Sequence, residues 1–263
     1  MKIHLGPAGS PASSTLEGLA AVRQLGLQAM EAQFTHGINM GLQLAKQIGE
    51  ENQKQGIVLS VHAPYYINLA SEERSKVAAS KKRILDSCER AHIMGAKNIV
   101  FHAAYYGKHK KEETYSIVRE AMLEIMSIIE KNQWNVQLAP ETTGRISQFG
   151  TLDEIIKLVK EINCSFCLDS AHIYARANGN IDYSNVFRQL NFWKKPLHCH
   201  FSGIAFSEKG ERNHLNLNSN DFNDFAKHVL QSKRETTIIS ETPITWRDSL
   251  KMKKIFEQMG YKF

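Results

Sequence analysis

The stretch Cys167-Leu168-Asp169-Ser170-Ala171-His172 joins a short apolar run to an aspartate and a histidine, two residue types that bind metals. Six further segments carry imidazole or carboxylate side chains in a similar setting: Val61-His62, Val100-Phe101-His102, Leu138-Ala139-Pro140-Glu141, Leu197-His198-Cys199-His200, Glu211-Arg212-Asn213-His214 and Ile238-Ile239-Ser240-Glu241. This mixture of ligands suits Zn²⁺, Mn²⁺ or Fe²⁺. Ligands repeated at the C-terminal ends of strands predict one metal cluster at the top of a parallel β-barrel.

Around these segments, short apolar runs alternate with longer amphipathic ones. The predicted strands are residues 3–5, 29–33, 57–62, 98–102, 136–141, 165–169, 197–201 and 237–241. The predicted helices are residues 15–25, 41–53, 72–94, 112–131, 151–161, 221–231 and 246–259. Such alternation predicts βαβ units and a parallel sheet.

Eight such units in 263 residues fit a closed barrel, which typically needs about 250 residues. We therefore expect an α/β protein in which residues 1–263 form a single TIM-type (β/α)8 barrel, with the metal cluster at the C-terminal face of its strands. The alternative is an open doubly wound sheet. It would need a glycine-rich phosphate loop after the first strand, and Gly6-Pro7-Ala8-Gly9-Ser10 does not follow that pattern.

Composition indicates an ordinary globular protein, with 42% hydrophobic and 23% charged residues. No apolar run approaches the roughly 20 residues that span a bilayer, and Lys2-Ile3-His4-Leu5 leads into a strand rather than a signal peptide. We therefore expect a cytoplasmic protein with no membrane partner. The net charge of +6 is compatible with a polyanion partner. Cys164 and Cys167 have C-x-x-C spacing but run along a predicted strand, so we interpret them as buried structural residues.

A lone buried histidine is more often a hydrogen-bonded core residue than a metal ligand. That interpretation suits His198, which would lie one layer below His200 on the same strand face. It is poorer for six residues that end six different strands: His62, His102, Glu141, Asp169, His200 and Glu241. Three buried carboxylates at one end of a barrel would repel one another unless cations neutralise them.

The candidate ligands number nine once His172, Glu211 and His214 are added to these six. Nine ligands are too many for one ion and fit two or three, because a structural zinc uses four. Metal clusters of this kind are the usual means of hydrolysing phosphodiesters.

These segments resemble the endonuclease IV family of abasic-site endonucleases, over the whole chain. The most specific match is Cys167-Leu168-Asp169-Ser170-Ala171-His172, which is close to that family's signature around its aspartate and histidine ligands. Further matches are Pro140-Glu141-Thr142-Thr143-Gly144, Ser240-Glu241-Thr242-Pro243 and His62-Ala63-Pro64-Tyr65-Tyr66-Ile67-Asn68-Leu69.

The resemblance implies an eight-stranded α/β barrel with a trinuclear centre of up to three Zn²⁺, or Mn²⁺ at one or more sites. His62, His102 and Glu141 would hold the first metal. Glu141 would bridge to a second metal, also held by Asp169, His200 and Glu241. His172, Glu211 and His214 would hold the third. A hydroxide between the first two metals would attack the phosphate 5′ to the abasic sugar in duplex DNA, giving a 3′-hydroxyl and a 5′-deoxyribose phosphate, with Glu141 as the catalytic residue.

This sequence departs from the family in three places. The family often has His-Pro-Gly-Ser after its second histidine, where this chain has His102-Ala103-Ala104-Tyr105-Tyr106-Gly107. The family's third site usually has Asp-x-His, where this chain has Glu211-Arg212-Asn213-His214, so Asn213 is an alternative ligand. The family's DNA-inserting arginine has no counterpart in residues 34–40, which leaves Met40 or Tyr66 as candidate wedges.

A basic rim on the metal-bearing face would bind the DNA backbone. The predicted DNA contacts are Tyr65, Asn68, Lys108, Arg145, Lys209 and Arg212, the first two by resemblance. Arg176 also falls on this face. We expect a monomer that associates with the nucleoid through DNA. The alternatives are a sugar isomerase or epimerase of the xylose-isomerase-like barrels, with one or two metals, and a DNA-binding protein without activity.

Overall fold

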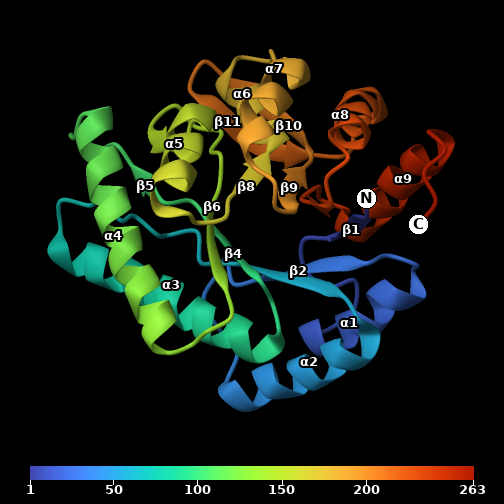
Figure 1. Ribbon diagram of the computed structural model, residues 1–263, viewed down its shortest axis with the longest axis horizontal. Coiled ribbons are helices and arrows are strands. Elements are labelled where there is room, and N and C mark those ends of the chain that lie inside the picture. The colour runs from blue at the N-terminus through green and yellow to red at the C-terminus, as the bar shows by residue number, and fades with distance from the viewer.

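Eight parallel strands form the centre of the protein, whose computed structural model describes residues 1–263 (Figure 1). Each predicted strand is present, within two residues of its expected bounds. They are β1 (Ile3–Pro7), β2 (Ala29–Gln33), β3 (Val58–His62), β4 (Asn98–Phe101), β6 (Gln137–Pro140), β8 (Cys167–Asp169), β9 (Leu197–Phe201) and β12 (Thr236–Ser240). The strands are buried along most of their length, as expected when helices cover a parallel sheet.

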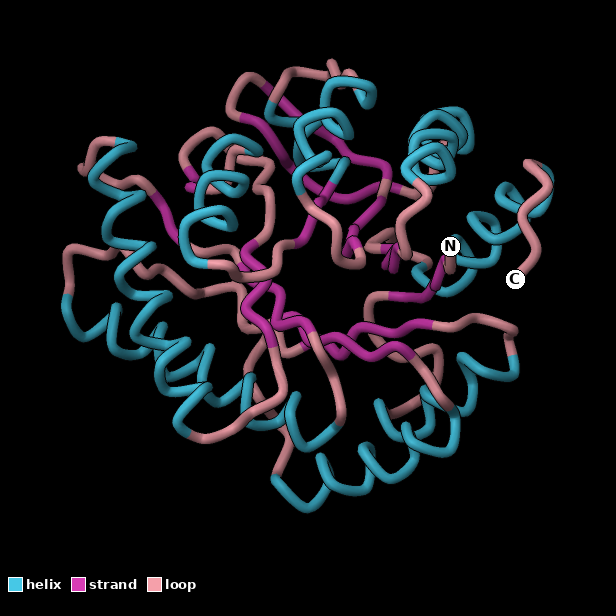
Figure 2. The backbone as a smooth tube through the Cα atoms, viewed as in Figure 1, coloured by secondary structure: helices cyan, strands magenta, loops and turns pink.

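The strands pair in the orders β1-β12-β9-β8 and β2-β3-β4-β6, all parallel. Parallel bridges join the two halves, one between Ala8 and Glu31 and the other between Glu141 and Cys167. Figure 2 shows the resulting ring of strands inside a ring of helices. The predicted TIM barrel is therefore confirmed.

The seven predicted helices surround the barrel. They are α1 (Thr15–Gln24), α2 (Leu42–Gln55), α3 (Arg74–Met94), α4 (Lys111–Lys131), α5 (Leu152–Ile162), α8 (Ser219–Ser232) and α9 (Thr245–Gln258). Each buries an apolar stripe against the strands, and α5 has the clearest one, formed by Ile155, Leu158, Val159 and Ile162. A capping box between Thr151 and the Glu154 side chain fixes where α5 begins.

The two long connections that follow β8 and β9 contain regular structure that the sequence did not predict. The first holds α6 (Ser170–Arg176) and α7 (Tyr183–Gln189), followed by the 3₁₀ turn η1 (Leu190–Phe192). The second folds into the antiparallel hairpin β10 (Gly203–Ser207) and β11 (Gly210–Leu215). A shorter antiparallel pair, β5 (Ala104–Tyr105) and β7 (Gln148–Phe149), lies after β4 and β6. Helices α6 and α7 have seven residues each and are too short to show a hydrophobic period, and β11 (GERNHL) has no apolar alternation.

Helix α6 begins where it does because the Asp169 carboxylate accepts a 2.7 Å hydrogen bond from the His172 backbone N–H. Asp182 caps α7 in the same way through Asn185. Cys164 and Cys167 are buried free thiols, as predicted. None of the helices combines the length and the hydrophobicity that a membrane-spanning segment requires.

Candidate metal centre

The strand-end residues singled out in the sequence meet at one end of the barrel. His62 and Asp169 are the last residues of β3 and β8, and His200 is the penultimate residue of β9. The other strand-end candidates follow their strands within one residue. Within each of three groups, one potential ligand atom per residue lies within 4.8 Å of the others. The groups are His62, His102 and Glu141; Glu141, Asp169, His200 and Glu241; and His172, Glu211 and His214.

Glu141 belongs to the first two groups and divides its carboxylate between them. Its Oε2 lies 3.4 Å from His62 Nε2 and 3.0 Å from His102 Nε2. Its Oε1 lies 3.0 Å from His200 Nδ1. His62 Nδ1 lies 2.8 Å from the Ala63 carbonyl oxygen, to which it donates when Nε2 is left free to face Glu141.

The second group is the most buried and contains three carboxylates. His200 Nδ1 lies 3.4 Å from Glu241 Oε1 and 4.0 Å from Asp169 Oδ2, in addition to its contact with Glu141. Asp169 and His200 are completely buried. Three carboxylates around one imidazole form an oxygen-rich site that suits a hard or borderline divalent cation.

The third group combines α6 with the hairpin. His172 Nε2 lies 3.4 Å from Glu211 Oε2, and His214 Nε2 lies 4.0 Å from Glu211 Oε1. His172 Nδ1 lies 2.9 Å from the Thr142 carbonyl oxygen, and His214 Nδ1 lies 2.8 Å from Ser202 Oγ. Each imidazole is thus fixed by a contact at Nδ1, and its Nε2 faces Glu211.

A β-bulge explains how Glu211 and His214 reach the same side of β11. Ala205 pairs with Asn213 and Phe206 pairs with Glu211, so Arg212 is the extra residue. In a regular strand, residues three apart point to opposite faces. The bulge restores a common face, which accounts for the additional residue in this segment. Asn213 is exposed, and its amide donates to the His214 carbonyl oxygen, so it stays outside the group.

One residue of this region was missed in the sequence. Glu31, on β2, is completely buried and lies 3.1 Å from His200 Nε2 and 3.0 Å from His198 Nε2. Ser60 Oγ donates a hydrogen bond of 2.8 Å to it. A carboxylate behind an imidazole fixes the ring's orientation and makes it a stronger ligand. A charged residue in the middle of a predicted barrel strand was the available signal. The interpretation of His198 as lying one layer below His200 agrees with these contacts.

In these groups, burial and neighbouring charges shift the pKa values of the side chains in opposite directions. Burial alone would raise the pKa of Glu141, but the charges of His200 and His102 outweigh it and hold that pKa well below its ordinary value. Burial would lower the pKa of His62, but contact with Glu141 raises it to about 9. Burial raises the pKa of Asp169 to about 6. The neighbouring carboxylates likewise raise the pKa values of His172 and His200, so without a metal these imidazoles favour the protonated form.

The residues fit a divalent cation. Buried polar atoms nearly always have a hydrogen-bond partner, yet Glu141 Oε2, Asp169 Oδ2 and His172 Nε2 have none. One of these atoms belongs to each of the three groups. A bound cation would give each of these atoms a partner and would replace the protons on the imidazoles.

The predicted DNA contacts lie in different settings. Tyr65 is 55% exposed and packs edge-on against His36 and Tyr66. Asn68 is half-buried, and its side-chain Oδ1 accepts hydrogen bonds from the backbone N–H groups of Ala70 and Tyr105. Asn68 therefore supports the loops as well.

Met40 and Tyr66 were the two candidate wedges. The prediction of Met40 is wrong, because its side chain is buried in the core. Tyr66 is 43% exposed, and the Arg83 guanidinium lies 4.4 Å from its ring centre. Arg83 was not singled out in the sequence because it lies within α3, far from any strand end.

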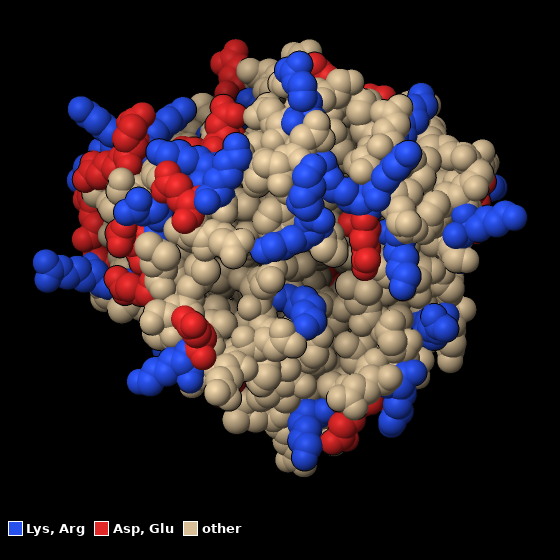
Figure 3. All heavy atoms as spheres, in the orientation of Figure 1, with Lys and Arg blue, Asp and Glu red and all other residues tan.

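Three of the four basic candidates gather at the hairpin. Arg145 forms an antiparallel bridge with Gly210, beside Lys209 and Arg212, and all three basic residues are exposed. Lys108 lies apart from them and pairs with Glu72 at 3.2 Å. Figure 3 shows Lys and Arg side chains over the upper middle of one face, where Figure 1 places β8 to β10. Arg176 instead donates to the Thr143 and Arg145 carbonyl oxygens and so fastens two loops together.

The comparisons with known proteins now place the chain. The family model described as the xylose isomerase-like TIM barrel matches residues 19–257. The chain belongs to this family. An uncharacterized protein of Methanocaldococcus jannaschii is 38% identical, over 97% of each chain. A probable endonuclease 4 of Mycoplasma mobile is 28% identical, over 70% of this chain and 68% of its own length. The predicted resemblance to endonuclease IV is therefore confirmed.

Solved structures with this fold include an endonuclease and a protein described as epimerase-like. Endonuclease IV from Thermus thermophilus superposes with a TM-score of 0.76 at 19% identity, covering 97% of this chain and 99% of the other. A D-tagatose 3-epimerase-like protein superposes with a TM-score of 0.73 at 19% identity, covering 98% and 96%. At this identity the likeness shows the fold alone, and the side chains must decide the function.

Proposed function

We propose that this chain is a DNA-repair endonuclease that hydrolyses the phosphodiester 5′ to an abasic site in duplex DNA, leaving a 3′-hydroxyl and a 5′-deoxyribose phosphate. The observation that carries the proposal is the third ligand group, His172, Glu211 and His214, beside two groups that share Glu141. A centre for up to three Zn²⁺, with Mn²⁺ as an alternative at some positions, accounts for all nine ligating side chains. When bound, the metals would supply Lewis acidity and activated water.

The chain's own residues would perform three tasks. Glu141 would hold two metals at a fixed separation, because its two oxygens face different groups. His172 and His214, each anchored through Nδ1, would present Nε2 to the third metal. Arg145, Lys209 and Arg212 would bind backbone phosphates, which gives affinity without sequence preference.

The other DNA contacts come from the loop after β3, where Tyr65 is exposed beside Asn68. An aromatic ring at this rim can fill the gap that a missing base leaves in the stack. We propose that the protein acts on DNA as a monomer.

A sugar isomerase or epimerase is the alternative within the same family. The second group alone, with three carboxylates and one histidine, could hold the single metal that such chemistry needs. This alternative would assign no function to the third ligand group or to the basic residues of the hairpin.

The test is incision of a duplex that contains a tetrahydrofuran abasic site, which cannot react by β-elimination. We expect nicking on the 5′ side that leaves an extendable 3′-hydroxyl and is lost when a strong chelator is present. The Glu141→Gln variant is the matched control, because it keeps the shape of the side chain and loses its charge. Fully metallated protein that leaves this duplex intact would contradict the proposal.

A further inference from the structure

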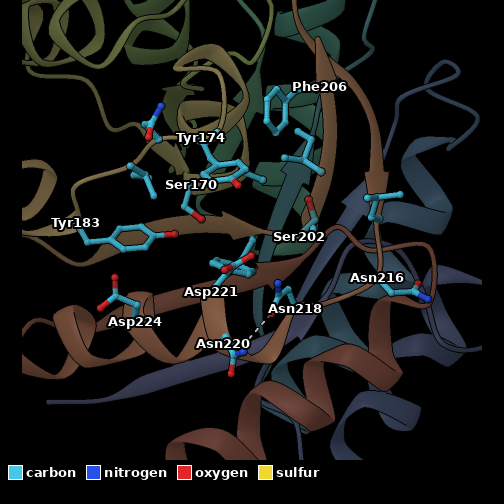
Figure 4. A pocket seen from close by; sticks show the side chains of 18 residues that line it. Ser170, Tyr174, Tyr183, Ser202, Phe206, Asn216, Asn218, Asn220, Asp221 and Asp224 are labelled. Atoms are coloured by element: carbon cyan, nitrogen blue, oxygen red, sulfur yellow. Dashed lines mark hydrogen bonds between the residues drawn. The ribbon is translucent and has the colours of Figure 1, made fainter.

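A pocket of about 550 Å³, shown in Figure 4, is lined by none of the nine candidate metal ligands. It is bounded by α6, the segment that leads to α7, the hairpin β10–β11 and the first turns of α8. Ser202 lines it, and the Ser202 hydroxyl also contacts His214 of the third ligand group at 2.8 Å. The pocket and the metal centre therefore share a wall.

The charge of the pocket is opposite to that of the whole chain. The protein has 33 Lys and Arg residues, yet none of them lines this pocket. The charged residues that do are Asp221 and Asp224, on α8. A phosphate group would find no cation here and two carboxylates, so the pocket does not suit an anion.

The floor of the pocket offers a buried hydroxyl. Ser170 is 1% exposed, and its hydroxyl interacts with the Tyr183 phenol. Figure 4 shows this oxygen directed into the pocket, with the phenol of Tyr183 directed toward the same space. Two hydroxyl groups therefore lie at this side of the pocket, which is not purely apolar.

Aromatic rings form the walls. Tyr174 and Phe206 meet edge to face, with ring centres 5.5 Å apart and planes at 90°. Phe206 is 36% exposed, so part of one large apolar ring is left open to the pocket. A planar heterocycle can stack on such a ring, and stacking of this kind tolerates any base.

The rim is rich in amides. Asn218 uses its carbonyl oxygen to accept a hydrogen bond of 3.0 Å from the Asn220 backbone N–H, which leaves its NH₂ group free (Figure 4). The Asn180 NH₂ group donates to the Ala177 carbonyl oxygen, which leaves the Asn180 carbonyl oxygen free. Asn pairs with the donor and acceptor on the edge of adenine, and Asp accepts from the amino group of cytosine.

We propose that this pocket binds a nucleobase that carries an exocyclic amino group, such as adenine or cytosine, with stacking on Phe206 and amino-group donation to Asp221. The source is a free nucleoside or an unpaired nucleotide of bound nucleic acid, because both present the same base. A base bound in this pocket would influence the third ligand group through the contact between Ser202 and His214. The proposal does not depend on nuclease activity.

The test is titration of the full chain with adenosine, inosine and 2′-deoxyribose, followed by calorimetry or ligand-observed NMR. We expect adenosine to bind, inosine to bind at least about 5-fold more weakly because it lacks the amino donor, and deoxyribose not to bind. Phe206→Ala should weaken adenosine binding at least about 5-fold. The matched control is Phe263→Ala, a similarly exposed ring at the C-terminus, which should leave binding unchanged.

Three outcomes would overturn the assignment: no adenosine binding at millimolar concentration, deoxyribose binding as well as adenosine, or equal loss in both phenylalanine variants. The source is decided with a duplex that contains one bulged adenine and a fully paired duplex. If Phe206→Ala weakens binding of the bulged duplex alone, the base comes from nucleic acid. If it weakens neither duplex but weakens adenosine binding, the ligand is a free nucleoside. These readouts require no incision, so they can fail while the proposed nuclease stands.

Discussion

The strand-end groups and the hairpin group differ in how they are built. The first two groups use side chains at the ends of barrel strands, and the Glu141, Asp169 and His200 side chains are fully buried. In the third group, the side chains of Glu211 and His214 retain 13% and 26% exposure, and both depend on a β-bulge in an inserted hairpin. Barrel geometry dictates the position of a strand end, whereas an insertion must be supported by its own local contacts.

The largest effect is expected where the two strand-end groups meet. Glu141→Gln removes the charge shared by two groups and leaves a neutral amide among histidines. We expect incision to fall by roughly 10²–10³-fold or more, the loss seen when a group that stabilises developing charge is removed. Single-turnover kinetics on the tetrahydrofuran duplex measures this, with circular dichroism to check the fold. Near wild-type turnover would exclude a shared role for Glu141.

The next effect concerns the support behind the strand-end groups. Glu31→Gln keeps a hydrogen bond to His200 but removes the charge that orients its ring. We expect metal affinity to fall by about 10–100-fold, as for other partners behind metal-binding histidines. Competition with a chromogenic chelator measures the affinity directly. An unchanged affinity would mean that Glu31 serves only to satisfy the barrel interior.

The hairpin group provides a matched pair of neighbouring residues. His214→Ala should reduce the bound metal by about one ion per chain and weaken incision, because one of only three ligands is lost. Asn213→Ala is the control, since that side chain is exposed and lies outside the group. The count is obtained by elemental analysis of dialysed protein. Equal effects of the two substitutions would refute a metal site in the hairpin.

The strand-end groups could be predicted from the sequence, whereas the hairpin group could be predicted only in part. The eight strands and the residues that end them, such as His62 and Asp169, could be placed because apolar runs of strand length alternate with amphipathic helices. The strand-end ligands could be grouped because parallel strands that alternate with helices bring their C-terminal ends to one face.

The hairpin, α6 and the role of Glu31 could not be predicted with the same certainty. Whether Glu211 and His214 share a face depends on the bulge at Arg212, and the sequence left Asn213 as an alternative. Glu31 contacts His198 and His200 across 167 and 169 positions of sequence, which no local pattern reveals. Met40 was a candidate wedge because of its position in a loop, but that loop folds its side chain inward.

The smallest expected effect is on the stability of metal-free protein. The His62 pKa is raised from 6.5 to about 9 on folding, so its stabilising contribution is complete below pH 6.5 and is lost as pH rises through about 9. Asp169, whose pKa is raised from 3.8 to about 6, loses its contribution over a lower range, as pH rises toward 6, and has little effect above pH 6. We expect the melting temperature of chelator-treated protein to fall between pH 6 and pH 9. Metallated protein should show a weaker fall, because metals replace these protons. Identical profiles would indicate that the groups bind no metal.

The number of metal ions bound per chain tests the central claim most directly. The account predicts about three ions in protein saturated with Zn²⁺ and dialysed, with His214→Ala losing one of them. A single ion, unaffected by His214→Ala, would contradict it. That result would leave the hairpin group without a metal and would favour the sugar isomerase or epimerase alternative.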